Sequence, residues 1–562
     1  MQDAQIPGIA HEVSCYSAPE VKKAAYKQIR REIDSLEASI RALKARHNSL
    51  SITARLPPEI LSEIFDWTAA MLRKKPFRWI RISFVCSHWR RVALECPKLW
   101  RRVNCTSPER LRVLLPRAGV VPLQIYLSLV TKRSAAGILQ ALQEMYRVRE
   151  LRLGSHIVPG TLESMELVLS RLTQPAPLLE TFSVVSTARP ECLHLPGDLF
   201  AGHAPRLRTL ELAGCIVPST SPVLTGITSL KLRGTDQSSH GISLNELIIM
   251  LESLPNIQAL ELDRAHHSES VAPPGRTVHL PYLHKLDISY DSATCAALLS
   301  CLNYPRAITT TQNIKAKYVG RLEGLRSLGV ILATRTCPLT YVQVYGVETG
   351  LVFRGWGRAG THLQFPVDDP HIDIELSCSG SSLTPLRAVW QALPIAGLES
   401  LFIEGDISED AGLRDFGNLS SLKTVHVEDA ASNFLWALKQ GLPDCGLENN
   451  NAFPFSQKLK GPGRLSFQAL RTLVPGGQYV DHSSRMGIRE ATELKRCFRE
   501  RRKRGVPLRE LHISRSLLRK GMRGEIIEIF RTVVKEVHWG LHSKGIDMDM
   551  EDYSLGESSD ED

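Results

Sequence analysis

The sequence lacks the features that send a protein into the secretory pathway or hold it in a membrane. Its 12 cysteines are scattered and include no C-x-x-C pair, so neither a disulfide framework nor a zinc site is indicated. No apolar run approaches the roughly twenty residues of a membrane helix, because the best stretch, Gly119 to Val130, is interrupted by Pro122 and Gln124. The N-terminus shows no basic segment followed by an apolar one. We expect a soluble protein of the cytoplasm, the nucleus or both.

Catalytic and cofactor motifs are also missing. The sequence contains no Walker loop, no H-E-x-x-H and no G-x-S-x-G. One glycine triplet, Gly355-x-Gly357-x-x-Gly360, has the spacing of a dinucleotide site, but such a site needs a helix to open at the third glycine. Here the chain reads as extended and then stops at Pro366. We therefore expect no enzymatic activity, no cofactor and no metal.

The composition is that of a folded protein with a basic balance. Its 562 residues are 43% apolar and carry a formal net charge of +10, which allows several domains or one elongated repeat array. The sharpest basic run is 495–504. Such a run is either a nucleic-acid or nuclear-localisation patch or the solvated side of a helix.

A heptad pattern occupies residues 20–52, after an arm at 1–19 that has no periodicity and predicts disorder. Glu37 and Arg41 stand at i, i+4 in the favourable order for a helix. The spacing predicts an amphipathic helix that either forms a short coiled coil or packs onto neighbouring helices. Its apolar residues, at alternating steps of four and three with His47 in the one polar slot, are Ile29, Ile33, Leu36, Ile40, Leu43 and Leu50.

Residues 53–103 predict a small helical module. Pro58 suits the first position of a helix, and Glu59 places a negative charge in its first turn. The segment 56–65 then carries a broad apolar face, and 82–92 repeats apolar residues at three- and four-residue spacing. Two short helices bury little area, so a partner outside the module is expected.

The order LPPE-I-L-x-E-I-F, VC-x-x-W-R-x-V-A and P-x-LW resembles the F-box, by which substrate receptors attach to the Skp adaptor of cullin-RING ubiquitin ligases. The connection from Met71 to Arg78 departs from the family pattern because it is basic and broken by Pro76. The resemblance implies adaptor contact at positions of which some must instead form the core of the module: Leu56, Pro57, Ile60, Leu61, Ile64, Phe65, Val85, Trp89, Leu99 and Trp100.

Beyond residue 103 the sequence repeats L-x-x-L-x-L in degenerate form. The last three positions alternate apolar, polar and apolar, as a short strand with one buried face requires. Helical patterns lie between the copies, and several end at proline. Consecutive copies are some twenty to thirty residues apart, which is typical of leucine-rich repeats. The copies begin at Val148, Leu207, Ile227, Ile257, Leu283, Leu398, Leu422 and Leu508.

The predicted fold class is therefore α/β. A long helix and an all-α F-box module precede an irregular leucine-rich-repeat solenoid of parallel strands and helices over 104–540. The tract 306–380 reads as extended segments, either an inserted sheet or repeats without helices, and 445–464 as a flexible loop. A helix over 524–538 is expected to cap the array. The acidic tail 541–562 predicts disorder.

The whole pattern resembles fungal F-box receptors with degenerate leucine-rich repeats, which implies a non-catalytic ligase subunit. Skp, and cullin through it, would be its partners, and the repeats would hold an unknown protein substrate. The competing hypothesis is a nucleic-acid- or chromatin-associated scaffold that uses residues 495–504. A bound substrate would meet the inner strand face, at Arg152, Glu211, Lys231, Glu261, Asp287, Phe402, His426 and His512.

Overall fold

The structure is a computed structural model. Predictions for residues 1–15, for the loop at 445–464 and for the tail at 541–562 lie outside the residues that it describes. The described residues are 16–72, 78–105, 107–127, 130–155, 161–186, 192–234, 242–264, 275–305, 311–318, 322–335, 337–347, 350–357, 370–378, 391–405, 413–428, 434, 437–438, 466–476, 488–513 and 523–539.

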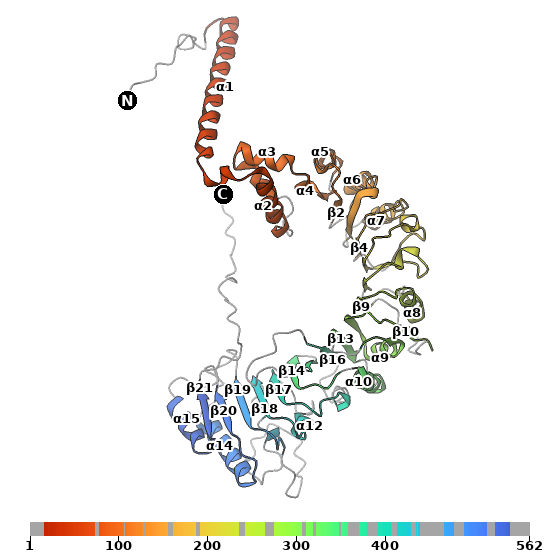
Figure 1. The fold of residues 1–562 in the computed structure, drawn as a ribbon, viewed down its shortest axis with the longest axis vertical. Helices are drawn as coiled ribbons and strands as arrows, with labels where there is room; N and C mark the ends of the chain where they lie inside the picture. The colour runs from red at the N-terminus through yellow and green to blue at the C-terminus, as the bar shows by residue number, and fades with distance from the viewer. Residues whose placement is uncertain are drawn as a thin grey trace. The chain divides into compact units, whose positions relative to one another are not determined.

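The chain divides into two compact units, 1–154 with 159–180 and 155–158 with 181–562, and each is considered by itself. The first unit opens with helices. Helix α1 begins at a proline and runs without interruption for 31 residues (Figure 1). Among the shorter helices that follow, α2 and α4 begin at prolines, and α3 is capped by Cys86, whose side chain accepts a hydrogen bond from the amide of Trp89. The helices of this region are α1 (Pro19–Ser49), η2 (Ile52–Arg55), α2 (Pro58–Met71), η3 (Arg78–Phe84), α3 (Ser87–Glu95) and α4 (Pro97–Trp100).

Among its described residues, three parallel strands, three α-helices and the short helix η4 (Met145–Arg147) complete the first unit. Strand β1 pairs with β2, and β2 pairs with β3, both in parallel. Leu123, Ile125 and Leu127 on β2 are buried while the residues between them are half-buried. The elements are β1 (Arg102–Asn104), α5 (Pro108–Ala118), β2 (Leu123–Leu127), α6 (Lys132–Leu142), β3 (Val148–Ser155) and α7 (Thr161–Leu169).

The second unit begins with strands that pair in chain order and in parallel. The expected alternation is present, since Leu260 and Leu262 are buried and Glu261 between them is half-buried. Helices α8 (Leu244–Glu252), α9 (Ser292–Cys301) and α10 (Leu322–Arg335) lie along one side of the strands (Figure 1). The strands of this sheet are β4 (Thr181–Ser186), β6 (Thr209–Ala213), β8 (Ser229–Arg233), β9 (Ala259–Asp263), β11 (Lys285–Asp291) and β13 (Thr311–Tyr318). Two separate parallel pairs are formed by β5 (Leu193–His194) with β7 (Cys215–Ile216) and by β10 (Val278–His279) with β12 (Leu302–Asn303).

Chain order breaks within 306–380. Strand β16 (Ile372–Cys378) pairs in parallel with β13, and β14 (Tyr341–Val347) pairs in parallel with β17 (Ser400–Glu404). Between β16 and β14 lies β15 (Gly350–Trp356), antiparallel to both. The extended segments expected at 339–347, 350–354 and 372–376 are strands of the same sheet as their neighbours. The prediction is wrong for the tract as a whole, because α10 (Leu322–Arg335) is a helix within it.

The remaining strands return to parallel pairing in chain order. The expected terminal helix over 524–538 is wrong in its second half, because the helix ends at Arg531 and the chain adds β21 parallel to β20. Glu536–Trp539 alternates polar and apolar residues, which suits an edge strand. The elements are α12 (Leu413–Gly417), β18 (Thr424–Glu428), β19 (Thr472–Gly476), α14 (Ile488–Lys503), β20 (Glu510–Ile513), α15 (Arg523–Arg531) and β21 (Glu536–Trp539).

The protein thus combines N-terminal helices with a large, mostly parallel sheet. Every described copy of L-x-x-L-x-L contributes a strand. In the part of the chain that the structure describes, no helix is long and apolar enough to cross a bilayer. The same residues contain no group of three or more side chains suited to hold a metal ion.

Candidate functional site

Helix α2 has two apolar faces with opposite environments. Leu61 and Phe65 are each 1% exposed and point into the module. Four other apolar side chains are exposed at i, i+4, i+7 and i+11, which places them on one side of the helix. We call them the outer stripe: Ile60 (48% exposed), Ile64 (44%), Trp67 (72%) and Met71 (84%).

The inner face packs against aromatic residues from the neighbouring helices. The rings of Phe65 and Trp89 have centroids 5.1 Å apart, and those of Trp79 and Trp100 are 5.0 Å apart, edge to face. The indole Nε1 of Trp100 donates a hydrogen bond to the carbonyl of Ala93 at 2.9 Å. These contacts define the core of the module.

Ion pairs hold α4 against another side of α2. Lys98 Nζ lies 2.6 Å from Glu63, and Arg101 lies 3.0 Å from Asp66. The hydrogen bond and charge of Glu63 raise the pKa of Lys98. Since Glu63 and Asp66 lie off the outer stripe, α4 leaves that stripe uncovered.

The structure sorts the ten predicted adaptor positions by burial. Leu61, Phe65, Leu99 and Trp100 are buried, and Leu56 and Trp89 are half-buried. The exposed positions are Pro57, Ile60, Ile64 and Val85.

Three exposed apolar side chains of the module are absent from the predicted adaptor positions: Trp67, Met71 and Phe84. Trp67 and Met71 continue the spacing of Ile60 and Ile64 along the helix. That narrower pattern could have been recognised. The sequence prediction places Leu61 and Phe65 on the same apolar face as Ile60 and Ile64, and this broader face does not distinguish the outer stripe.

A cavity of 570 Å³ lies beside the module, between η3, α3, α4 and α5. Phe84, Trp100 and Val113 supply apolar walls, and Arg90 and Arg110 add positive charge. The guanidinium of Arg117 lies 4.5 Å from the centroid of the Trp100 ring. This cavity is distinct from the outer stripe.

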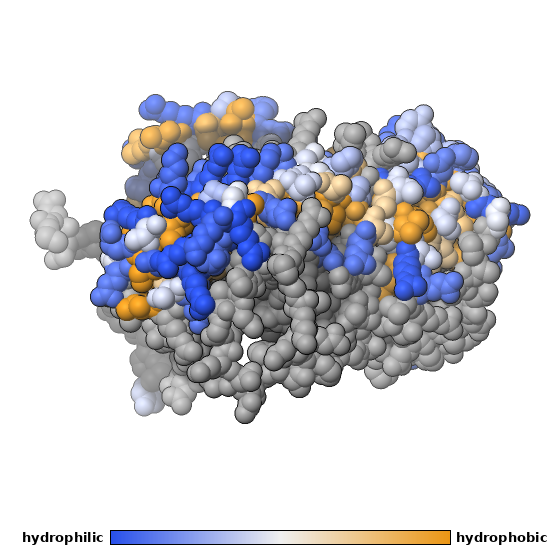
Figure 2. All heavy atoms as spheres, turned by 90° about the horizontal axis from the view of Figure 1, so that it is seen from below, coloured by the Kyte–Doolittle hydropathy of each residue, from blue (hydrophilic) through white to orange (hydrophobic). Residues whose placement is uncertain are grey.

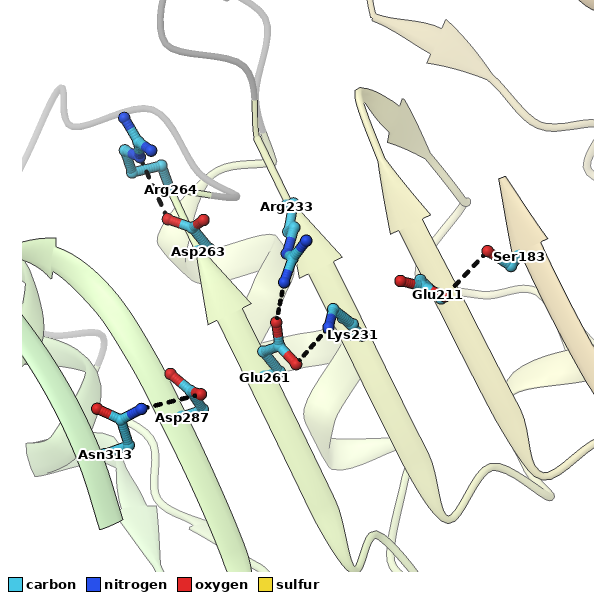
Figure 3. Close-up of polar contacts among 9 residues, drawn as sticks. All are labelled: Ser183, Glu211, Lys231, Arg233, Glu261, Asp263, Arg264, Asp287 and Asn313. Atoms are coloured by element: carbon cyan, nitrogen blue, oxygen red, sulfur yellow. Dashed lines mark hydrogen bonds and ion pairs between the residues drawn. The ribbon is translucent and has the colours of Figure 1, made fainter. Parts of the chain in front are cut away.

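In the second unit, four of the predicted substrate-binding residues form one row across the sheet. Glu211, Lys231, Glu261 and Asp287 occupy matching register positions on β6, β8, β9 and β11. All four are half-buried. Figure 3 shows them side by side with their partners.

The row is internally paired. Glu261 binds Lys231 at 2.7 Å and Arg233 at 2.6 Å. Ser183 donates to Glu211 at 3.0 Å, and Asn313 donates to Asp287 at 3.2 Å (Figure 3). The sheet therefore offers a mixed, largely compensated charge pattern.

Neighbouring carboxylates in this row have pKa values shifted in opposite directions. Burial raises the pKa of Glu261, but the hydrogen bonds and charges of Lys231 and Arg233 outweigh it, so the net shift is downward. Burial and the charge of Glu261 raise the pKa of Asp287, and Lys285 and Lys315 offset this only in part.

The other predicted substrate-binding residues differ in environment. Phe402 (2% exposed), His426 (9%) and His512 (4%) lie on the strands as expected but are buried, so they offer no accessible surface. Arg152 is half-buried on β3 of the first unit, 3.7 Å from Glu150. The described surface row thus comprises Glu211, Lys231, Glu261 and Asp287.

The basic run 495–504 belongs mostly to α14, and not all of it is surface. Cys497 and Phe498 are buried, and Arg501 is 1% exposed. Arg501 donates hydrogen bonds to the carbonyls of Ser466, at 2.8 Å, and Phe467. The exposed cations are Arg496, Arg499, Arg502, Lys503 and Arg504. Figure 2 shows the molecule from the end where α14 lies in Figure 1, and hydrophilic residues gather toward the left of this face, with hydrophobic residues among them.

Comparison with known families finds one match in the helical module. A family model described as F-box-like matches residues 53–106, which is less than half of the chain. No curated protein matches the sequence. The chain therefore carries an F-box-like domain, and domains of this kind serve in the substrate-recognition subunits of ubiquitin ligases.

Proposed function

We propose that this protein is the non-catalytic substrate-recognition subunit of a Skp-cullin-F-box ubiquitin ligase. The observation that carries the proposal is the outer stripe of α2, which is exposed within the region that matches the F-box-like family. Such a subunit would act in the cytoplasm, the nucleus or both.

The outer stripe has the properties of a protein-docking surface. Ile60, Ile64, Trp67 and Met71 form a continuous apolar strip on one helix, which monomeric proteins seldom leave open to water. Trp67 adds a large aromatic side chain of the type that dominates binding energy at interfaces. The buried aromatic core behind it holds the strip in place.

We infer a revised set of adaptor contacts. Leu61, Phe65, Leu99 and Trp100 support the module from inside. The contacts proposed here are Leu56, Pro57, Ile60, Ile64, Trp67, Met71, Val85 and Trp89.

The test is capture of purified Skp adaptor by the full-length protein. Ile64→Asp places a charge in the stripe and should abolish capture, and Trp67→Ala should weaken it by at least about tenfold. Ala70→Asp introduces the same charge on α2 outside the stripe and should retain binding. Failure of the intact protein to capture Skp, or equal loss with Ala70→Asp, contradicts the proposal. Capture of Skp without cullin would retain docking and remove the ligase assignment.

The substrate surface is a separate part of the proposal. We infer that the parallel strands and helices of the second unit are degenerate leucine-rich repeats, and that the row Glu211, Lys231, Glu261 and Asp287 faces the substrate. Its support is the shared register of these side chains and their partial exposure.

An exchange of charges tests that surface. The triple variant Lys231→Glu/Arg233→Glu/Glu261→Lys keeps both ion pairs at this position but reverses the pattern offered to a partner. Proteins bound and ubiquitinated with the wild type should be lost with this variant, while capture of Skp should persist. An unchanged set of ubiquitinated proteins would argue against the row as substrate surface.

A second candidate function is a nucleic-acid-associated scaffold. It is favoured by the exposed cations that lie together on and just after α14. Neutralising Arg496, Arg499 and Arg502 should then weaken binding to duplex DNA and reduce the dependence of the remaining binding on salt. Binding that is absent in wild type, or insensitive to these changes, excludes this candidate.

A further inference from the structure

Helix α1 presents an apolar stripe that none of the described residues of its unit covers. Ile33 is 49% exposed, Leu36 60%, Ile40 50% and Leu43 63%. No residue of the helix is buried, and its closest packing is with the short helix η2. The alternative prediction, in which the stripe of α1 packs onto the F-box helices, is wrong for this structure, because no residue of α1 is buried.

The stripe is narrow, which distinguishes it from the face of a helix that belongs to a globular core. A core-facing helix carries apolar residues at three or four positions in every seven, whereas a coiled-coil seam uses two. The opposite side of α1 holds Ala38 and Ala45, and its flanks carry the ion pair between Glu37 and Arg41 at 3.3 Å. One seam, and no second apolar surface, runs along the helix.

The residue types along the seam indicate how many helices it joins. In heptad notation Tyr26, Ile33 and Ile40 occupy a positions, and Ile29, Leu36 and Leu43 occupy d positions, with Leu50 just beyond the helix end, so the pattern of isoleucine at a and leucine at d holds from Ile33 onward. In parallel coiled coils, a β-branched residue at a with leucine at d favours two strands. Isoleucine at a and leucine at d form separate layers only when a residues pack against a residues and d residues against d residues. This packing occurs in a parallel pair.

We propose that α1 pairs with α1 of a second copy of this chain in a parallel, two-stranded coiled coil. At 31 residues the helix spans more than four heptads, or ~46 Å. His47 stands at the last a position, where one polar residue fixes the register at some expense of stability. Since only residues 50–57 separate α1 from α2, both copies of the outer stripe emerge at the same end of the coil. This inference goes beyond the proposed function and does not depend on it.

The test is the oligomeric state of the full-length protein by sedimentation equilibrium. The wild type should be a dimer. Ile40→Asp, which places a charge in the seam, should raise the dissociation constant at least about a hundredfold. Ala38→Asp adds the same charge on the far side of the helix and should leave the dimer intact. His47→Ile should tighten it. A monomeric or trimeric wild type, an unaffected Ile40→Asp dimer, or equal loss with Ala38→Asp overturns the proposal.

Cross-linking tests the parallel arrangement. Leu43→Cys should form an intermolecular disulfide under mild oxidation, because d meets d in a parallel pair, and Ala45→Cys should give no more cross-linking than wild type. A Leu43→Cys variant that stays dimeric but gives no cross-link overturns the parallel arrangement. Ile40→Asp should still capture Skp, so failure of dimerisation and failure of adaptor docking are separable.

Discussion

The ring of Trp89 lies against that of Phe65, with centroids 5.1 Å apart and ring planes tilted by 55°. This contact fixes the rotation of α2 about its axis. With Phe65 turned toward the core, its neighbour Ile64 must face outward, together with Ile60 and Trp67. The aromatic core of the module thus determines which side of the helix is available to a partner.

The first prediction contrasts these adjacent residues. Phe65→Ala removes a ring that is 1% exposed and should lower the free energy of unfolding of the module by about 3–5 kcal/mol. Ile64→Ala, at 44% exposed, should change it by less than about 0.5 kcal/mol. Hydrogen exchange of the amides in α2 and α3 measures this locally. Similar losses of protection in both variants would contradict the assignment of faces.

The contrast also shows what the sequence of the module predicted and what it did not. Proline at the helix start and the spacing of apolar residues predicted α2 and the existence of an apolar face. They did not separate Ile60 and Ile64 from Leu61 and Phe65. An apolar face that includes all four residues allows several rotations of the helix about its axis, and each rotation buries a different pair. The rotation depends on Trp89, which is distant in sequence, so only the folded module reveals it.

The second prediction concerns the basic run on α14. Arg501 donates to two backbone carbonyls, and one of them belongs to Phe467, whose φ of 55° is unusual for a residue with a side chain. Arg501→Ala should lower the free energy of unfolding by about 1–3 kcal/mol for each carbonyl left without a donor. The exposed Arg502→Ala should change it by less than about 0.5 kcal/mol. Hydrogen exchange in α14 and β19 distinguishes the two, and equal protection would exclude a structural role for Arg501.

The third prediction uses two carboxylates with opposite pKa shifts. The lowered pKa of Glu261 means that its contribution to stability is complete above the unfolded value of about 4.3 and is lost as pH falls through the folded value. Glu261→Gln should therefore reduce stability at neutral pH by roughly 0.5–1 kcal/mol, allowing for solvent screening. The difference from wild type should shrink in acid.

Asp287→Asn is the matched variant, and we expect it to change stability at neutral pH in the opposite direction to Glu261→Gln. A raised pKa means that the folded state binds its proton more tightly, so ionisation destabilises the fold as pH rises. Asp287→Asn should raise the thermal unfolding midpoint at neutral pH and lose this advantage below pH ~4. Destabilisation by Asp287→Asn at neutral pH would contradict the shift.

The positions of the strands were largely predictable from sequence. The solvent exposure of the side chains on the sheet face away from the helices was not. The L-x-x-L-x-L pattern located β6, β8, β9 and β11 because alternate burial leaves a direct trace in sequence. Phe402, His426 and His512 obey the same pattern, yet they are buried, because β17, β18 and β20 are covered on both faces. The pattern reports only the side that packs against the helices, so it cannot reveal whether the other side is also covered.

The last prediction concerns His512, which is 4% exposed and stacks on His538 with ring centroids 4.4 Å apart. Burial and the neighbouring His538 lower the pKa of His512, while the hydrogen bond with Glu510 opposes the shift. The unfolded chain therefore binds a proton at higher pH than the folded one, and stability falls as pH drops below the unfolded value of about 6.5. His512→Gln should flatten that dependence in thermal unfolding midpoints, whereas the exposed His194→Gln should leave it unchanged. An equal slope in wild type and His512→Gln would show that this buried imidazole is not responsible for the acid sensitivity.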